Sequence, residues 1–364
     1  MPLTKETAKT VYLHIGFFKT GSTAIQNLLT INRKLLLDNN CFYPDLGSHD
    51  HFCIPARMAR EINSPVPPRR LVAGCSGTSS ELWERVLGEF DSSGADNLIL
   101  SAETFVDFSF SEESSQLVSV VREWLSGFDV KIILYLREHI PYIRSLYQEC
   151  VKTLGLTLCE DRFIQNQING WHMNYGWTLN YWSEVFGREN IIVDRYRGGE
   201  YGEQGLFMDF LQKIGLKWSE EYKSPSREQS NPAIAREWVE AKRLSSLVKD
   251  NGVPSVASLK KLNASCGKVP EDSIKYINQK IATDVRHVNE NFNIRTPLEI
   301  TGVTCEDLDT SDLNYNAIYL RSILLLLGLY HIPRRPKSER TCSASLVRAR
   351  EYIARLAELK SRLR

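Results

Sequence analysis

The chain has 364 residues, of which 42% are hydrophobic and 24% are charged, and its formal net charge is +1. These values are typical of a globular protein and exclude a disordered or fibrous chain. A net charge this small gives no bulk field that would draw the protein onto nucleic acid. The N-terminus, Met1–Thr10, is polar, and no apolar run approaches the about 20 residues of a membrane span. We therefore expect a cytoplasmic protein with no transmembrane segment.

The eight cysteines form no CxxC pair and no cluster with histidine at zinc-ligand spacing. Scattered single cysteines in a chain of this length are typical of reduced, buried thiols. We therefore expect neither a disulfide framework nor a structural metal.

Strands and helices are predicted to alternate through the first part of the chain. Apolar runs rich in β-forming residues predict buried strands at Val11–Ile15, Asn97–Ser101, Lys131–Leu136 and Ile191–Asp194. Helical periodicity follows directly after Gly21, and then at Glu113–Leu125, Pro141–Leu154, Tyr175–Phe186 and Gln204–Ile214. Buried strands separated by helices predict an α/β, P-loop-like fold of three layers, with a central parallel sheet flanked by helices.

Two further regions interrupt or follow this alternation. The segment Gly47–Thr78 is rich in Pro, Gly, Ser and Arg, and we interpret it as an excursion over the ligand-binding edge of the sheet. Beyond Asn231 only helices are predicted, at Ala233–Val248, Ser273–Phe292 and Leu313–Leu327. We divide the chain into a core, a helical part of the same domain and a basic C-terminal extension, at residues 1–230, 231–331 and 332–364.

The C-terminal extension from Ile332 carries ten Lys and Arg against three Asp and Glu. Its predicted helix, Ser343–Leu363, has apolar residues at heptad spacing. Such a helix packs on its own domain or on a partner subunit in a homodimer. The alternative is a basic amphipathic helix on an anionic membrane surface.

The segment between the first strand and the first helix, Gly16–Thr23, reads Gly-Phe-Phe-Lys-Thr-Gly-Ser-Thr. It resembles the phosphate loop GxxxxGK[ST], but Ser22 stands where that loop has its lysine, and Lys19 comes earlier. Backbone N–H groups of Thr20–Thr23, with the positive end of the following helix, are suited to hold a phosphate. The simpler interpretation is a helix start capped by Ser22 or Thr23.

A second candidate anion site follows the strand that ends at Leu136. Arg137 comes directly after this strand, at the edge where open sheets bind ligands, and Ser145 lies eight positions later in the next helix. A guanidinium group can grip a phosphate with two parallel hydrogen bonds. Taken alone, Arg137 could equally be the ion-pair partner of Glu138 or of another carboxylate.

Together these segments resemble the family of sulfotransferases that use 3'-phosphoadenosine-5'-phosphosulfate (PAPS). The family's 5'-phosphosulfate loop is matched at Lys19, Thr20, Gly21, Ser22 and Thr23, and its 3'-phosphate site at Arg137 and Ser145. Its later helix–strand–helix part is similar to Leu179–Tyr196 and Gln204–Leu216, so the resemblance extends from about residue 10 to about residue 220. It implies a P-loop-like α/β fold and sulfuryl transfer without a metal.

The resemblance gives the shifted lysine a physical meaning. PAPS has no β- and γ-phosphate; its reacting bond joins the sulfur to the bridging oxygen of the 5'-phosphate. An ammonium group on the loop, at Lys19, would lie beside this oxygen and neutralise the charge that builds there as the bond breaks.

The acceptor hydroxyl must lose a proton, and the family takes it with a His or a Glu. The candidates are His51 and His49, in the segment after the first helix, and Glu103, directly after a core strand. The two histidines could instead be a hydrogen-bonded loop pair, and Glu103 could pair with Arg137 or orient the substrate. His14, inside the first strand, is interpreted as a core residue.

Two other functions compete with this assignment. One is a P-loop kinase or NTPase, in which Asp194 at the end of a core strand would hold magnesium, although the lysine expected at position 22 is missing. The other is a non-catalytic relative that binds a carbohydrate or a nucleotide.

The acceptor is expected to be a carbohydrate or glycolipid precursor. The segments that could line its site are Gly47–Thr78, the aromatic-rich stretch Trp171–Trp177 and the helices after Asn231. Aromatic faces suit sugar rings, but the two tryptophans fit a core equally well.

Overall fold

The computed structural model describes residues 9–62, 77–109, 112–201, 204–224, 236–248, 269–304 and 318. The chain divides into two compact units, each drawn from separate stretches. The first comprises Met1–His139, Asn169–Ser226 and Lys280–Thr301; the second comprises Ile140–Ile168, Arg227–Gln279 and Gly302–Arg364. The division at residues 230 and 331 stays a prediction.

The first unit is built around a five-stranded parallel sheet with the strand order β2-β3-β1-β4-β5. The strands are β1 (Thr10–His14), β2 (Cys41–Phe42), β3 (Asn97–Ser101), β4 (Asp129–Leu136) and β5 (Ile191–Arg195). Four of them lie where apolar runs predict strands, so the predicted α/β class with a parallel sheet is confirmed. The two-residue β2 was not predicted, because so short a segment carries no periodicity.

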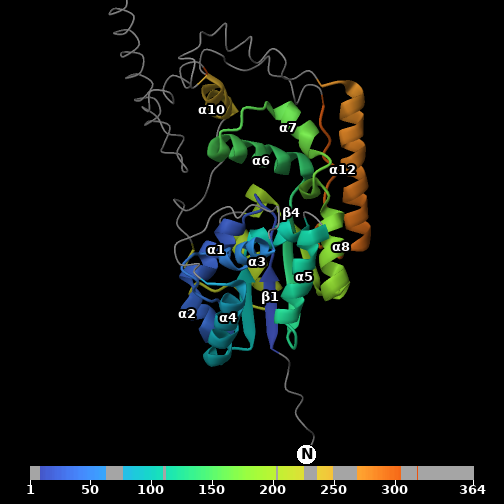
Figure 1. Cartoon of the computed structure of the whole chain (residues 1–364). Coiled ribbons are helices and arrows are strands. Elements are labelled where there is room, and N and C mark those ends of the chain that lie inside the picture. Colours follow the sequence, from blue (N-terminus) through green and yellow to red (C-terminus); the bar gives the residue numbers. More distant parts are fainter. Residues whose placement is uncertain are drawn as a thin grey trace, which may run out of the picture. The chain divides into compact units, whose positions relative to one another are not determined.

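Helices cover both faces of this sheet, and Figure 1 shows α1 and α5 on opposite sides of the strands. On one face, α1 (Ser22–Ile31), α2 (Arg33–Asp38) and α9 (Gly205–Lys213) share a buried apolar cluster with β3 and β4. On the other face, α8 (Tyr175–Phe186) packs against β4, β5 and α5 (Glu112–Trp124). Further helices of this unit are α3 (Cys53–Glu61) and α4 (Ser79–Ser93), and its 3-10 turns are Glu103–Ser109, Trp171–Met173, Arg188–Asn190 and Gly198–Tyr201.

The strand order has a topological consequence for the position of the candidate residues. From β1 the chain builds β2 and β3 on one side of the sheet, and then crosses to β4 on the other side. The switch point therefore lies between β1 and β4, which pair with His14 opposite Ile133. Ligands of open α/β sheets bind outside the carboxyl ends of the strands at such a point. The Gly16–Thr23 loop follows β1 and Arg137 follows β4, so both lie at this edge.

The second unit contains α6 (His139–Leu154) from Ile140 onward, α7 (Glu160–Gln167) and α10 (Arg236–Val248). The ring of Tyr147 packs against Phe163, and its hydroxyl donates to Glu240 at 3.0 Å. Helix α12 (Glu271–Asn291) contributes residues to both units.

The helices predicted at Pro141–Leu154, Ala233–Val248 and Ser273–Phe292 are confirmed as α6, α10 and α12. The predicted helices Leu313–Leu327 and Ser343–Leu363, and residues 63–76 of the proline-rich excursion, lie outside the described residues. Among the helices that the structure describes, none is long and apolar enough to cross a membrane.

Candidate functional site

The loop between β1 and α1 adopts an unusual backbone. Gly16 and Gly21 have φ angles of 49° and 84°, and Lys19 between them has a φ of 65°. Left-handed backbone costs a residue other than glycine about 1–2 kcal/mol. Strain of this kind persists where the surrounding structure enforces it, and it is concentrated at functional sites. Lys19 is therefore a candidate functional residue on backbone grounds as well as on sequence grounds.

Neighbouring side chains leave little room for a Cβ atom at Gly16 or Gly21. A Cβ atom on Gly16 would lie 2.9 Å from Ser22 Oγ and 3.5 Å from Glu103 Cβ, and one on Gly21 would lie 2.9 Å from Tyr196 Cε2. The loop is thus enclosed by the segment after β3 on one side and the segment after β5 on the other. Larger residues at either position would push these neighbours away.

The loop presents the N-terminus of α1 without a side-chain cap. Thr20 Oγ1 and Ser22 Oγ both donate to the carbonyl oxygen of Phe17, at 2.6 and 3.3 Å, so these hydroxyls brace the loop. The N-cap residue is Gly21, and no side chain caps the helix. The first N–H groups of a helix have no partner within it, and its dipole is positive at this end. The N–H groups of Ser22 and the exposed Thr23 are therefore available to an anion.

Arg137 and this loop share a neighbour, the ring of Tyr196. The Arg137 side chain is half-buried, and its guanidinium carbon lies 6.0 Å from the centre of the Tyr196 ring, which also lines Gly21. In the described stretches no carboxylate pairs with Arg137, and Glu138, the alternative partner considered above, pairs with Arg195. A half-buried guanidinium group that no described carboxylate neutralises, at the same edge of the sheet as an uncapped helix start, is suited to bind a multiply charged anion.

Tyr175 of α8 connects the loop to Arg137. Its hydroxyl donates to the carbonyl oxygen of Arg137 at 2.8 Å, and the Phe17 ring meets its ring edge-on with the centres 4.9 Å apart. The Asp284 carboxylate accepts from the Tyr175 N–H and contacts His139 Nε2, both at 2.9 Å. Sequence reasoning missed this support, because Asp284 is separated from His139 by 145 positions.

The environment of His51 differs from the one expected for a base. The side chain has no exposed surface, its Nε2 lies 3.0 Å from the Pro44 carbonyl oxygen, and its Nδ1 accepts from the Ser101 N–H at 3.0 Å. Burial lowers the pKa of His51 to about 4. Both ring nitrogens are thus engaged, and His51 fastens the segment after α2 to the end of β3. The side chain of His49 is exposed, and its carbonyl oxygen accepts from Tyr43 at 2.7 Å.

Glu103 and Ser145 complete the set of predicted site residues. Glu103 opens the 3-10 turn directly after β3, is half-buried, and lies beside Gly16 of the loop. Ser145 is on α6 in the second unit. The pairing of Ser145 with Arg137 stays a prediction, because the two residues belong to different units.

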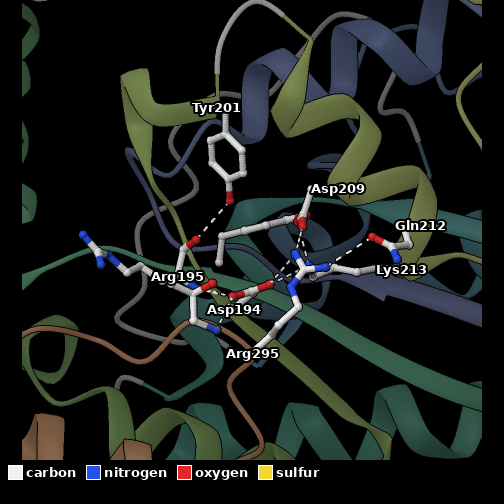
Figure 2. Close-up of polar contacts among 9 residues, drawn as sticks. Asp194, Arg195, Tyr201, Asp209, Gln212, Lys213 and Arg295 are labelled. Carbon is white, nitrogen blue, oxygen red and sulfur yellow. Dashed lines mark hydrogen bonds and ion pairs between the residues drawn. The ribbon is translucent and has the colours of Figure 1, made fainter.

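Asp194, the magnesium ligand of the kinase alternative, belongs to a network of ion pairs (Figure 2). One of its carboxylate oxygens contacts Lys213 Nζ at 2.9 Å and Arg295 Nη2 at 3.0 Å. The other accepts from the backbone N–H groups of Arg195 and Thr296 at 2.8 and 3.3 Å. Both oxygens are therefore occupied by donors of the chain itself. Within the described part of the chain, no group of three or more His, Cys, Asp or Glu side chains could hold a metal ion.

Asp209 of α9 shares the cations of this network. It pairs with Arg295 and with Lys213, and it accepts from the Tyr135 hydroxyl at 2.7 Å. Burial alone would raise the pKa of Asp209, but the hydrogen bonds from Lys213 and Tyr135 and the two positive charges lower it overall. The network joins β4, β5 and α9 to the segment after α12, and so it fixes the strand that leads to Tyr196.

Comparison with known proteins gives limited similarity. No protein-family model matches the chain. An uncharacterized protein of Archaeoglobus fulgidus is 26% identical over 191 residues, which are 52% of this chain and 44% of that relative, so the match spans less than half of the relative's length. A solved structure of a sulfotransferase from Alicyclobacillus acidocaldarius is similar with a TM-score of 0.35 and 15% identity, over 73% of this chain and 99% of that one.

Proposed function

We propose that the protein transfers a sulfuryl group from PAPS to a hydroxyl group of a carbohydrate or glycolipid. The observation that carries this proposal is the position of two anion-binding elements at one switch point of the sheet. The uncapped loop follows β1, and Arg137, which pairs with no carboxylate of the described residues, follows β4; both lie against the Tyr196 ring. A nucleotide with one phosphate at its 5' position and another at its 3' position is a ligand that uses both elements.

The loop residues would bind the 5'-phosphosulfate end. Backbone N–H groups from Thr20 to Thr23 donate hydrogen bonds to its phosphate oxygens, with the positive end of α1 behind them. The ammonium group of Lys19 neutralises the charge that develops on the bridging oxygen as its bond to sulfur breaks. Arg137 grips the 3'-phosphate with two hydrogen bonds. A contribution of Ser145 to the same phosphate stays a prediction from the sequence.

We propose Glu103, rather than His51, as the base. The acceptor oxygen attacks sulfur in line with the departing phosphate oxygen, and its proton passes to the Glu103 carboxylate. Glu103 is half-buried at the carboxyl edge of the sheet and borders the loop, whereas His51 is buried with both nitrogens engaged. His51 then acts on catalysis only by holding the end of β3 in place.

The kinase or NTPase alternative has less support. Ser22 stands where such enzymes have their phosphate-loop lysine, and the Asp194 carboxylate is occupied by Lys213 and Arg295.

Ligand binding and turnover test the proposal together. The product nucleotide adenosine 3',5'-bisphosphate (PAP) should raise the melting temperature in the presence of a metal chelator, whereas ATP with magnesium should leave it unchanged. Labelled PAPS is then incubated with a panel of sugar and glycolipid acceptors, with Lys19→Ala and Glu103→Gln as controls. Stabilisation by ATP and magnesium but not by PAP would overturn the proposal. Binding of PAP with no transfer to any acceptor would favour a non-catalytic relative.

A further inference from the structure

His14 is a buried polar residue with one unused nitrogen. It is the last residue of β1, only 1% of it is exposed, and its Nδ1 lies 2.8 Å from Ser101 Oγ. Its Nε2 is buried and has no hydrogen-bond partner among the residues that the structure describes. Burial lowers the pKa of His14 to about 3, so the ring is neutral at physiological pH. A buried polar atom without a partner is costly, and each one requires an explanation.

The neighbours of His14 determine which nitrogen carries the proton. The Gln26 amide donates to Ser101 Oγ at 3.3 Å, which leaves the hydroxyl proton of Ser101 to be donated elsewhere. In the described part of the chain its one acceptor within hydrogen-bond distance is His14 Nδ1. If Nδ1 carried the proton instead, the buried hydroxyl proton would have no acceptor. The proton of the neutral ring therefore sits on Nε2, which is a donor.

This Nε2–H group faces the phosphate loop. A Cβ atom on Gly16 would lie 3.4 Å from His14 Nε2 and 2.9 Å from Ser22 Oγ, so both atoms border the space above the glycine. Ser22 Oγ now donates to the Phe17 carbonyl oxygen at 3.3 Å, which is beyond the usual range for a hydroxyl donor. No donor among the described residues reaches Ser22 Oγ, so this oxygen can accept a hydrogen bond, and the bond that it donates to Phe17 is weak.

We propose that His14 is a positioning residue that completes a relay of donors into the loop. Gln26 donates to Ser101, and Ser101 donates to His14. When phosphate binds, the Ser22 hydroxyl turns from the Phe17 carbonyl oxygen to the 5'-phosphate, and its oxygen then accepts from His14 Nε2–H. All donors point the same way, so each hydrogen bond strengthens the next. No proton is transferred along the relay. It orients the Ser22 hydroxyl so that its hydrogen points toward the phosphate. The inference rests on the proposed anion site at the loop.

Three replacements of His14 distinguish the contribution of Nδ1 from that of Nε2. An asparagine amide can reach Ser101 but not the loop, a glutamine amide can place a donor where Nε2 was, and phenylalanine keeps only the volume. We expect His14→Asn and His14→Phe to weaken PAP binding by about tenfold in calorimetry, and His14→Gln to stay within about threefold of the native chain. Melting temperatures without ligand show which variants are folded.

A double-mutant cycle tests the relay itself. Ser22→Ala should weaken PAP binding by about tenfold, and adding His14→Asn should cost little more, because the two residues act through one hydrogen bond. If His14 variants do not fold, Gln26→Leu, at the far end of the relay, should still weaken PAP binding by about threefold. Fully additive losses for Ser22 and His14, or native affinity in His14→Asn, would overturn the relay.

Inorganic phosphate as a second probe separates this inference from the proposed function. If the native chain binds phosphate but not PAP, the proposed function fails, and the relay is judged by the same variants with phosphate. If the native chain binds neither phosphate nor PAP, the proposed function and the relay both fail.

Discussion

Replacing Lys19 with glycine should give an inactive protein that is more stable than the variant with alanine at this position. Lys19 has a φ of 65°, which costs a residue with a Cβ atom about 1–2 kcal/mol and costs glycine almost nothing. Lys19→Ala removes the same ammonium group but keeps the backbone strain. The difference between the two variants therefore isolates the backbone contribution from that of the side chain.

The greater freedom of glycine in the unfolded chain offsets part of this gain. We expect the free energy of unfolding of Lys19→Gly to exceed that of Lys19→Ala by about 1 kcal/mol. In a unit of roughly 200 residues this corresponds to a difference in melting temperature of roughly 2–4 °C. Thermal unfolding measured without ligand gives the value directly.

Both Lys19 variants should lose sulfuryl transfer by about 100-fold or more in single-turnover assays, while PAP affinity changes far less. Asn40 is a matched control, since it has a similar φ of 63° but an exposed side chain outside the loop. Asn40→Gly should leave transfer unchanged. The reasoning is refuted if Lys19→Ala melts at or above Lys19→Gly, or if Lys19→Gly retains the native transfer rate.

Three further predictions concern the base, the loop glycine and the ion-pair network. Glu103→Gln should lower the single-turnover rate by about 10²–10⁴-fold with little change in PAP affinity; an equal loss of affinity would make Glu103 a binding residue. Gly21→Ala should be less stable by about 1–3 kcal/mol than Gly94→Ala, which has a similar φ of 72° but no atom within 4 Å of the added Cβ; equal losses would exclude a clash with Leu206 and Tyr196. The network holds the pKa of Asp209 below its ordinary value, so its stabilisation is present above that value and is lost as the pH falls through the folded pKa. The native chain should therefore melt at a clearly higher temperature than Asp209→Asn at pH 7, and this difference should decrease below about pH 4. A difference that does not change with pH would contradict the prediction.

The fold was largely predictable because each long strand is a run of apolar residues buried on both faces. Asn97–Ser101 and Tyr175–Phe186 have the predicted bounds. Helix α4 was missed although its signals were present: Thr78 and Glu81 form a capping box, and Trp83 lies on a buried apolar stripe. The predicted excursion Gly47–Thr78 includes Thr78, the N-cap residue of this helix.

The positions of candidate site residues in the fold were predictable only where these residues directly follow strands. The loop after β1 and Arg137 after β4 satisfy this condition, since the ends of parallel strands meet at one edge of a sheet. Tyr175 and Arg295 could not be placed, because their contacts join segments far apart in the chain. The sequence did not predict the environment of His51 either, because its burial and its contact with Ser101 depend on packing against β3.

The central claim is that Arg137 and the loop after β1 bind the two ends of one nucleotide. Calorimetry with PAP and with adenosine 5'-phosphate, which lacks the 3'-phosphate, tests it in the native chain and in Arg137→Ala. We predict that the native chain prefers PAP by about 10–100-fold, from charge-assisted hydrogen bonds to the 3'-phosphate, and that Arg137→Ala binds both nucleotides equally. A preference for PAP that survives in Arg137→Ala would contradict the account.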